Sequence, residues 1–286
     1  MDGALEDALV DALTEEDDED ADGAGVLDDG SLEGRVAEWA RRAIAAYPRP
    51  TFPPEREWDV SVQGVVRLVP YVPRFATAPL ALLDRFGAVT IGPDNVGLDG
   101  KDVGWERVVE VRTAPAWTCL SAEALEVNLA QYVVALPPLP GRAWVLRRIS
   151  ELLLSLYLAV LPPDEDDAGA TADEAAADEA AADEAVADDD GRRPDAMFDR
   201  VVMQVVYRRR FGTGEAHAST TSVLLQLALP GSTETIVRTA AARGVEVVHD
   251  RAEDTSIGVV AARAATWRRT ALDLRDRVNR RVGREP

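Results

Sequence analysis

Histidine and serine are the residues of this sequence best suited to acid–base or nucleophilic chemistry. The chain contains two histidines, His217 and His249, and Ser219 and Thr220 follow the first of them closely. No serine lies within a Gly-x-Ser-x-Gly motif, which in many hydrolases places the nucleophile on a sharp turn. We therefore predict no catalytic residues and no enzyme activity, and we interpret both imidazoles as exposed or hydrogen-bonded side chains.

The cysteine and the acidic clusters show no pattern typical of a redox or metal site. Cys119 lies between Trp117 and Leu120, and because nothing beside it would lower its pKa we interpret it as a buried thiol. The sequence has no cysteine–histidine spacing typical of zinc, and its acidic clusters lack the glycine-anchored loop of a calcium site. Gly212-Thr213-Gly214 is not followed by the lysine of a phosphate loop. We predict neither a metal nor a cofactor.

The arginine clusters are a stronger indication of a binding surface than the histidines, the cysteine or the acidic clusters are of a catalytic or metal site. One cluster ends a predicted strand, and a second extends along residues 263–284, opposed only by Asp273 and Asp276. Two interpretations stay open: the solvated outer face of a docked helix, or a surface that binds nucleic acid, acidic lipid or an acidic protein. The candidate anion-binding residues are Arg208, Arg209, Arg210, Arg268, Arg269, Arg275, Arg277, Arg280 and Arg281.

Acidic residues are concentrated in two segments. Residues 1–30 and residues 164–190 each contain 13 acidic residues and no lysine or arginine, although the whole chain has a formal net charge of −20. The remainder holds 25 acidic against 31 basic residues, a net charge of +6, which excludes a salt-adapted acidic surface. We predict a disordered acidic leader at 1–30 and a disordered Ala/Asp/Glu insertion at 162–196, since neither carries an apolar stripe.

The first half of the remaining chain predicts helices on either side of strands. Residues 31–47 have apolar residues at helical spacing, and residues 58–69 have the valine-rich pattern of a strand. Residues 117–136 fit a helix or a strand. Residues 142–161 form a helix by their length, and its position in the core or at an interface stays open.

Residues 88–113 carry the clearest local pattern, AVTIGPDNVGLDGKDVGWERVVEVRT. Alternating apolar residues predict a β-meander, and Asp99-Gly100 supplies the positive φ angles of a tight hairpin. With Trp105, Val108 and Val111, the run resembles the opening meander of bacterial pleckstrin-homology-like (PH-like) proteins. The resemblance implies an antiparallel bent sheet or barrel closed by a C-terminal helix, and a binding or scaffolding role. The basic phosphoinositide clusters of that family do not carry over, because the meander has only three bases: Lys101, Arg107 and Arg112.

The second half predicts strands followed by helices. A strand around residues 201–208 is followed by a second strand at 218–229, a short helix at 236–243 and a short strand at 245–248. The longest predicted helix covers 255–282, with an apolar stripe that faces the body or a second copy of the chain. We thus predict an α+β fold with flanking helices and a long C-terminal helix.

The predicted domain organisation is one folded body in two parts, residues 31–161 and 197–286, separated by the acidic insertion. Neither part alone closes a sheet. The N-terminus does not resemble a signal peptide, and the most apolar window, 149–161, is shorter than the roughly 20 residues that span a bilayer. These features, with a single cysteine, predict a cytoplasmic protein without a transmembrane segment.

The functional prediction is a non-enzymatic binding or scaffold protein with a PH-like fold and a protein partner. The alternative is a regulator that associates with anionic membrane or nucleic acid through the arginine-rich C-terminal helix. In that alternative the acidic insertion competes with the external polyanion for the same arginines. A homodimer formed through the stripe at 260–282 also stays open.

Overall fold

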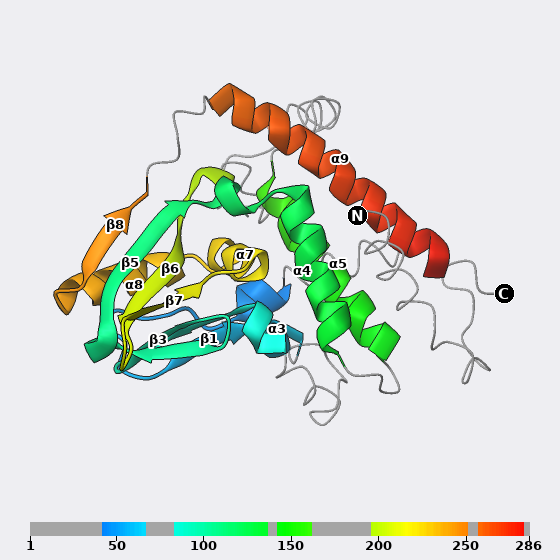
Figure 1. The fold of residues 1–286 in the computed structure, drawn as a ribbon. Coiled ribbons are helices and arrows are strands. Elements are labelled where there is room, and N and C mark those ends of the chain that lie inside the picture. The colour runs from blue at the N-terminus through cyan, green and yellow to red at the C-terminus, as the bar shows by residue number, and fades with distance from the viewer. Residues whose placement is uncertain (1–41, 67–82, 137–141, 162–195, 251–256, 283–286) are drawn as a thin grey trace, which may run out of the picture.

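The computed structural model describes five stretches of the chain: residues 42–66, 83–136, 142–161, 196–250 and 257–282 (Figure 1). The predicted acidic segments lie outside these residues, apart from Ala196 at the end of the second. Within them, helices and mostly antiparallel sheets combine, which confirms the α+β class. The described strands form two four-stranded sheets and do not close a barrel.

The first sheet is the predicted meander extended by one strand, in the order β1-β2-β3-β4. All of its pairs are antiparallel, and Asp99 and Gly100 have φ angles of 51° and 67° at the β3–β4 turn, as the Asp-Gly signal predicts. The strand prediction at 58–69 is wrong for Val62–Val66, where the valine-rich run forms a short helix, and its last three residues lie outside the described stretches. The elements are β1 (Trp58–Ser61), α3 (Val62–Val66), β2 (Ala88–Ile91), β3 (Asn95–Leu98) and β4 (Lys101–Gly104).

The second sheet joins the two parts of the chain, in the order β7-β6-β5-β8. Strand β5 comes from the first part and pairs antiparallel with β6 and parallel with β8, both from the second part. Strand β7 forms an edge and pairs antiparallel with β6. The bounds are β5 (Val108–Pro115), β6 (Arg200–Arg208), β7 (Thr213–His217) and β8 (Glu246–His249).

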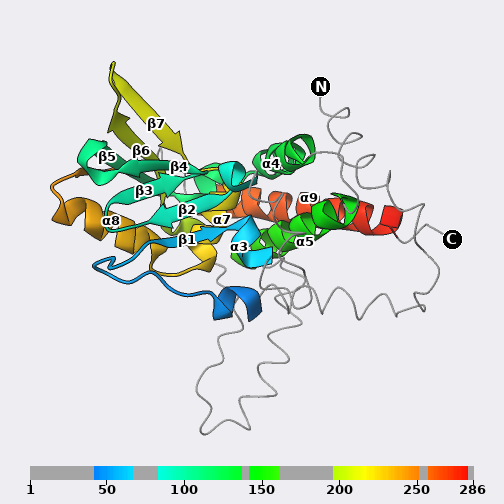
Figure 2. The same ribbon diagram turned by 90° about the horizontal axis from the view of Figure 1, so that it is seen from below.

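Helix α7 (Thr220–Ala228) lies between the two sheets (Figures 1 and 2). Every residue from Thr220 to Leu227 is buried, and the helix contacts β2 and β6 as well as α4 and α5. The strand predicted at 218–229 is therefore wrong. A helix enclosed on all sides has no polar face, so its sequence lacks the 3.6-residue alternation that distinguishes helix from strand.

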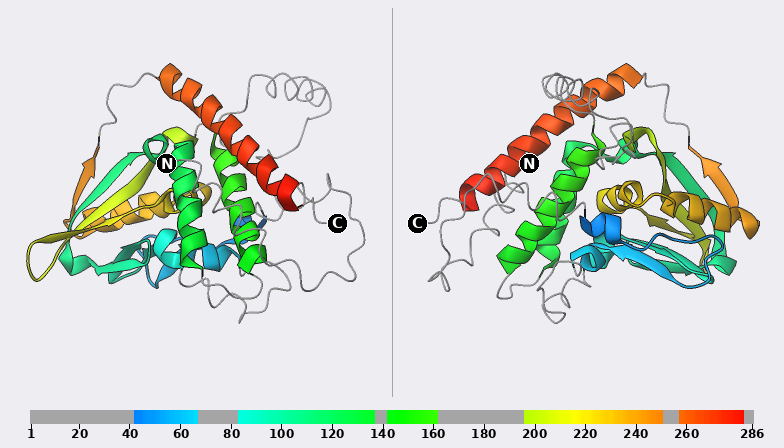
Figure 3. Two further views of the ribbon diagram at one scale, coloured as in Figure 1. Left: turned by 45° about the vertical axis from the view of Figure 1, so that its right-hand side comes forward. Right: turned by 180° about the vertical axis from the view of Figure 1, so that it is seen from behind.

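Three longer helices stand beside the sheets (Figure 3). Helix α4 settles the ambiguous stretch 117–136 as helix, and α5 is core, with Leu152, Leu153 and Tyr157 fully buried. The described stripe of α9, including Val260 and Ala264, packs on the body through α4 and α5. No helix of the described stretches has both the length and the apolar character needed to cross a bilayer. The bounds are α4 (Ala122–Ala135), α5 (Arg142–Val160), α8 (Ser232–Ala242) and α9 (Ile257–Val282).

Candidate anion-binding site

Three cationic side chains converge on the ring of Tyr207, at the end of β6. Lys101 Nζ lies 5.3 Å from the ring centroid, and the guanidinium carbons of Arg107 and Arg209 each lie 5.5 Å from it. Arg209 Nη2 also donates to the Tyr207 hydroxyl over 3.1 Å. Lys101 and Arg107 belong to the first sheet and its connection to β5, so the fold brings them to a hairpin about a hundred residues away in sequence.

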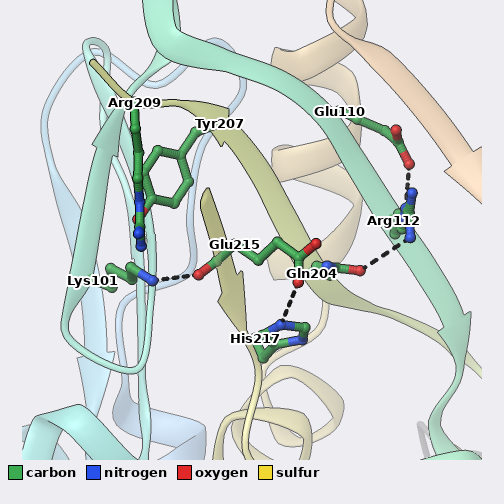
Figure 4. Close-up of polar contacts among 8 residues, drawn as sticks. All are labelled: Lys101, Glu110, Arg112, Gln204, Tyr207, Arg209, Glu215 and His217. Carbon is green, nitrogen blue, oxygen red and sulfur yellow. Dashed lines mark hydrogen bonds and ion pairs between the residues drawn. The ribbon is translucent and has the colours of Figure 1, made fainter. Parts of the chain in front are cut away.

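Backbone carbonyl groups hold two of these cations in place. Arg107 donates through Nε and Nη2 to the carbonyl oxygen of Arg208, over 3.2 and 3.1 Å. Lys101 donates to the carbonyl oxygen of Glu215 on the edge strand β7 (Figure 4). Because a carbonyl accepts a hydrogen bond without cancelling a full positive charge, the charges of Lys101 and Arg107 are oriented but not neutralised by these contacts.

The pKa of Tyr207 reflects the positive charges around its ring. Burial raises its pKa, and the hydrogen bonds and charges of Arg209 and Lys101 outweigh that effect, so the pKa of Tyr207 lies below its ordinary value. Gly214 permits this arrangement, since a Cβ there would lie 2.3 Å from Arg209 Nε and 2.7 Å from Tyr207 Cζ. The site therefore favours negative charge and requires a residue without a side chain beside it.

The β6–β7 turn adds further cations and an exposed ring. Arg208, Arg209 and Arg210 are all exposed, and the Arg209 N–H donates to the Gly212 carbonyl to close the turn, with Gly212 at a φ of 74°. Phe211 is 84% exposed, and the guanidinium carbon of Arg210 lies 5.6 Å from its centroid. We call this surface the cationic hairpin: Lys101, Arg107, Arg208, Arg209, Arg210 and Phe211, with Tyr207 beneath.

An ion pair and a histidine–carboxylate contact occupy the adjoining outer face of the second sheet. Arg112 pairs with Glu110 and contacts Gln204, and His217 Nε2 lies 3.0 Å from Glu215 Oε2 (Figure 4). Among the described residues, no ion pair uses Lys101, Arg107 or the three arginines of the turn. The cationic hairpin is thus the part of this sheet that keeps its positive charge available.

The candidate arginines of α9 divide into different roles. Arg268 is 7% exposed, and its Nη1 donates to the Leu158 and Leu161 carbonyls at the end of α5, over 3.1 and 3.5 Å. This contradicts its prediction as an exposed anion-binding residue, because the amphipathic face turns it inward, where it caps a neighbouring helix. Arg269 is exposed and Arg275 is partly exposed beside Asp276. The side chains of Arg277, Arg280 and Arg281 fall outside the described residues.

A second polar cluster lies in the interior, at the start of α7, and no sequence pattern predicted it. Asp99 accepts from the Ser219 N–H over 2.6 Å, and its other carboxylate oxygen accepts from the Ser219 and Ser222 hydroxyls over 3.0 and 2.6 Å. Thr221 accepts from the Tyr132 hydroxyl over 3.0 Å and donates to Asn128. Burial raises the pKa of Asp99 to about 6, against the lowering effect of Ser222 and Ser219.

These interior contacts give Ser219 a structural role. Its hydroxyl donates to Asp99 and to the Phe86 carbonyl, over 3.0 and 2.6 Å, and accepts the Ser222 N–H as the N-cap of α7. His217 and His249 lie on β7 and β8, the opposite edges of the second sheet. The structure therefore does not bring the histidines and Ser219 together as a catalytic triad.

The cysteine shows no activation. Cys119 is half-buried, and burial raises the pKa of its thiol although a hydrogen bond with Thr118 lowers it. In the described stretches, no group of three or more histidine, cysteine, aspartate or glutamate side chains is placed to hold a metal ion. A surface pocket beside α4 has a mainly apolar lining, with Phe86, Val127 and Val134 among its residues and Arg85 and Gln131 as its polar ones.

Comparisons with protein families, with curated proteins and with solved structures found no match to this chain. The PH-like resemblance of residues 88–113 therefore stays a prediction, and the site rests on its own geometry.

The arginine run at 208–210 was visible in the sequence, but its partners were not. Lys101 and Arg107 were noted only as too few bases for a phosphoinositide cluster, and the structure adds them to the run from the other sheet. The position of Phe211 could have indicated an exposed ring. This aromatic residue directly precedes Gly212-Thr213-Gly214, in a turn that normally favours polar residues.

Proposed function

We propose that this protein is a non-enzymatic binding or scaffold protein that recognises an anionic partner through the cationic hairpin. The observation that carries the proposal is the convergence of Lys101, Arg107 and Arg209 on Tyr207, from segments far apart in the sequence. Surface charges gathered on one projection raise both the rate and the strength of association with a polyanion.

The hairpin is a better candidate than α9, whose arginine-rich helix carries the alternative function predicted from the sequence. The described part of α9 uses Arg268 to cap α5, and its exposed arginines, Arg263 and Arg269, are spread around the helix together with the exposed Asp273 and Asp276. At the hairpin, the cations come from two sheets and surround one point. A multivalent anion gains more from converging charges than from the same number spread along a helix.

Two charge-matched double variants test the location of binding. Arg208→Gln/Arg210→Gln removes two exposed charges from the hairpin and keeps Arg209 on Tyr207, whereas Arg263→Gln/Arg269→Gln removes two exposed charges from α9. On a heparin column, the hairpin variant should elute at lower salt than the wild type, and the α9 variant should elute close to it. Earlier elution of the α9 variant than of the hairpin variant would show that the binding surface lies on α9.

The acidic insertion enters the proposal as a competitor for the partner. In sequence it begins after Leu161, whose carbonyl group accepts a hydrogen bond from Arg268 of α9. Deleting residues 164–190 removes 13 negative charges and should raise retention on heparin at low salt. Unchanged retention would show that the insertion does not compete.

A further inference from the structure

The tip of the β6–β7 hairpin combines an apolar ring with basic residues on a projection. The hairpin extends away from the body in two different views (Figures 2 and 3). Phe211 is the most exposed large apolar side chain of the described residues, at 84%, and Arg208, Arg209 and Arg210 directly precede it. A single exposed apolar side chain is common on protein surfaces, and what distinguishes Phe211 is its place on a projecting hairpin directly after three exposed arginines.

We propose that this tip binds the surface of a membrane that contains anionic lipid, with Phe211 entering the interface and the three arginines facing the lipid phosphates. The inference rests on the proposed function and names its partner. An apolar group and a basic patch act together at an anionic membrane surface, the first by burial in the interface and the second by attraction to the lipid headgroups. Both features occur here within four consecutive residues.

The exposed ring favours a membrane over a single-stranded nucleic acid. Nucleic-acid surfaces of that kind stack successive bases on several accessible aromatic rings. At the hairpin only Phe211 is accessible, since Tyr207 is 5% exposed and has Lys101, Arg107 and Arg209 around its ring. One ring at the end of a narrow projection suits insertion between lipid headgroups.

The charge layout sets the conditions for this attachment. The whole chain has a formal net charge of −20, so an anionic surface repels it at long range. Under physiological salt, charges farther apart than about 8 Å are largely screened, and the local arginines then determine the interaction. Attachment should therefore be strongest at intermediate salt and weaken at high salt.

Vesicle co-sedimentation tests the inference with the full chain. Phosphatidylcholine vesicles with and without phosphatidylserine are compared for the wild type, Phe211→Ala, Phe211→Trp and Phe52→Ala. Phe52 is the matched control, an exposed phenylalanine elsewhere with the Arg238 guanidinium carbon 4.0 Å from its centroid. Binding is expected only with phosphatidylserine, weakened at least about tenfold by Phe211→Ala and retained by Phe211→Trp and Phe52→Ala.

Three outcomes overturn the membrane inference while the proposed function stands. The first is retention on heparin without binding to phosphatidylserine vesicles. The second is equal vesicle binding by the wild type and Phe211→Ala. The third is that Phe211→Ala weakens binding to single-stranded DNA and leaves binding to vesicles unchanged. If the wild type binds neither heparin nor vesicles, the proposed function fails as well. Quenching of the Phe211→Trp variant by brominated lipid, above that of the wild type, would directly support insertion.

Discussion

The polar cluster at the start of α7 and the cationic hairpin both bring together polar side chains from distant parts of the sequence, the first in the interior and the second at the surface. In the interior cluster, Asp99, Ser219 and Thr221 each have partners inside the protein. At the hairpin, the exposed arginines of the turn form no ion pair with any described residue. A polar cluster satisfied from within positions the elements around it, whereas one left open to solvent is available to a partner. A perturbed pKa alone does not separate the two, because both Asp99 and Tyr207 have one.

The largest expected effect concerns Asp99 and pH. Its pKa rises from the ordinary 3.8 to about 6 in the folded chain, so between these values the folded chain keeps a proton that the unfolded chain has released. The contribution of Asp99 to the free energy of unfolding should therefore fall as the pH rises through this window, by up to about 3 kcal/mol, and level off above it. Urea unfolding across the window measures the slope.

Asp99→Asn is the control for that slope. Asparagine keeps an acceptor for the Ser219 N–H and tolerates the φ of 51°, but it does not titrate. The difference in stability between the two proteins should change with pH, in favour of the variant as pH rises. A constant difference would show that the carboxyl group does not carry the effect.

Thr221→Val is expected to cost about 2 kcal/mol of stability. The substitution keeps the shape of a fully buried side chain but removes the partner of the Tyr132 hydroxyl and of Asn128. Chemical denaturation measures the loss. Thr266→Val is the matched control, since Thr266 is exposed on α9 and bonds only within its helix, and it should change stability by less than about 0.5 kcal/mol. Equal losses of stability in the two variants would show that the interior cluster stabilises the fold no more than an exposed helix position does.

Arg268 and Arg269 give a neighbouring pair on one helix. Arg268→Gln should lower the free energy of unfolding by about 1–2 kcal/mol, because the Leu158 and Leu161 carbonyls lose a charged donor. Arg269→Gln should change it by less than about 0.5 kcal/mol, since Arg269 is exposed. Thermal unfolding of both variants checks the order, and a larger loss in Arg269→Gln would contradict the packing described for α9.

The smallest effect on stability is expected at the hairpin. Arg208→Gln/Arg210→Gln should change the free energy of unfolding by less than about 0.5 kcal/mol while lowering retention on heparin. Both quantities are measured on the same preparation. A large loss of stability would place these arginines with the interior cluster, as structural residues.

Local sequence signals predicted the fold where a single element determines its own structure. The Asp99-Gly100 pair specified the β3–β4 turn, and the stripe of α9 specified a long helix packed on one side. The prediction of a strand at the position of helix α7 was wrong because the whole circumference of this helix is buried. The predicted strand at β1 was too long because packing overrode the β propensity of the following valines. The structure of these two segments depends on neighbouring elements that are distant in the sequence, so the local sequence could not predict it.

The candidate site was predictable only in part for the same reason. Arg208, Arg209 and Arg210 were apparent as a run, but their meeting with Lys101 and Arg107 depends on β7 lying against the first sheet. Arg268 and Arg269 are adjacent in sequence and differ in burial because helical geometry turns them to different faces. A charged residue in a sequence can bind either a group of its own protein or another molecule, and its exposure in the structure distinguishes the two cases.

Lys101 provides the most direct test of the cationic hairpin, because it is the only lysine in the sequence. In acetylation by an amine reagent, Lys101 and the terminal amino group are the two targets, and the terminus serves as the internal reference. With a heparin oligosaccharide bound, mass spectrometry should show slower acetylation of Lys101 at an unchanged rate at the terminus. Equal rates at Lys101 with and without the bound oligosaccharide would contradict binding at the cationic hairpin.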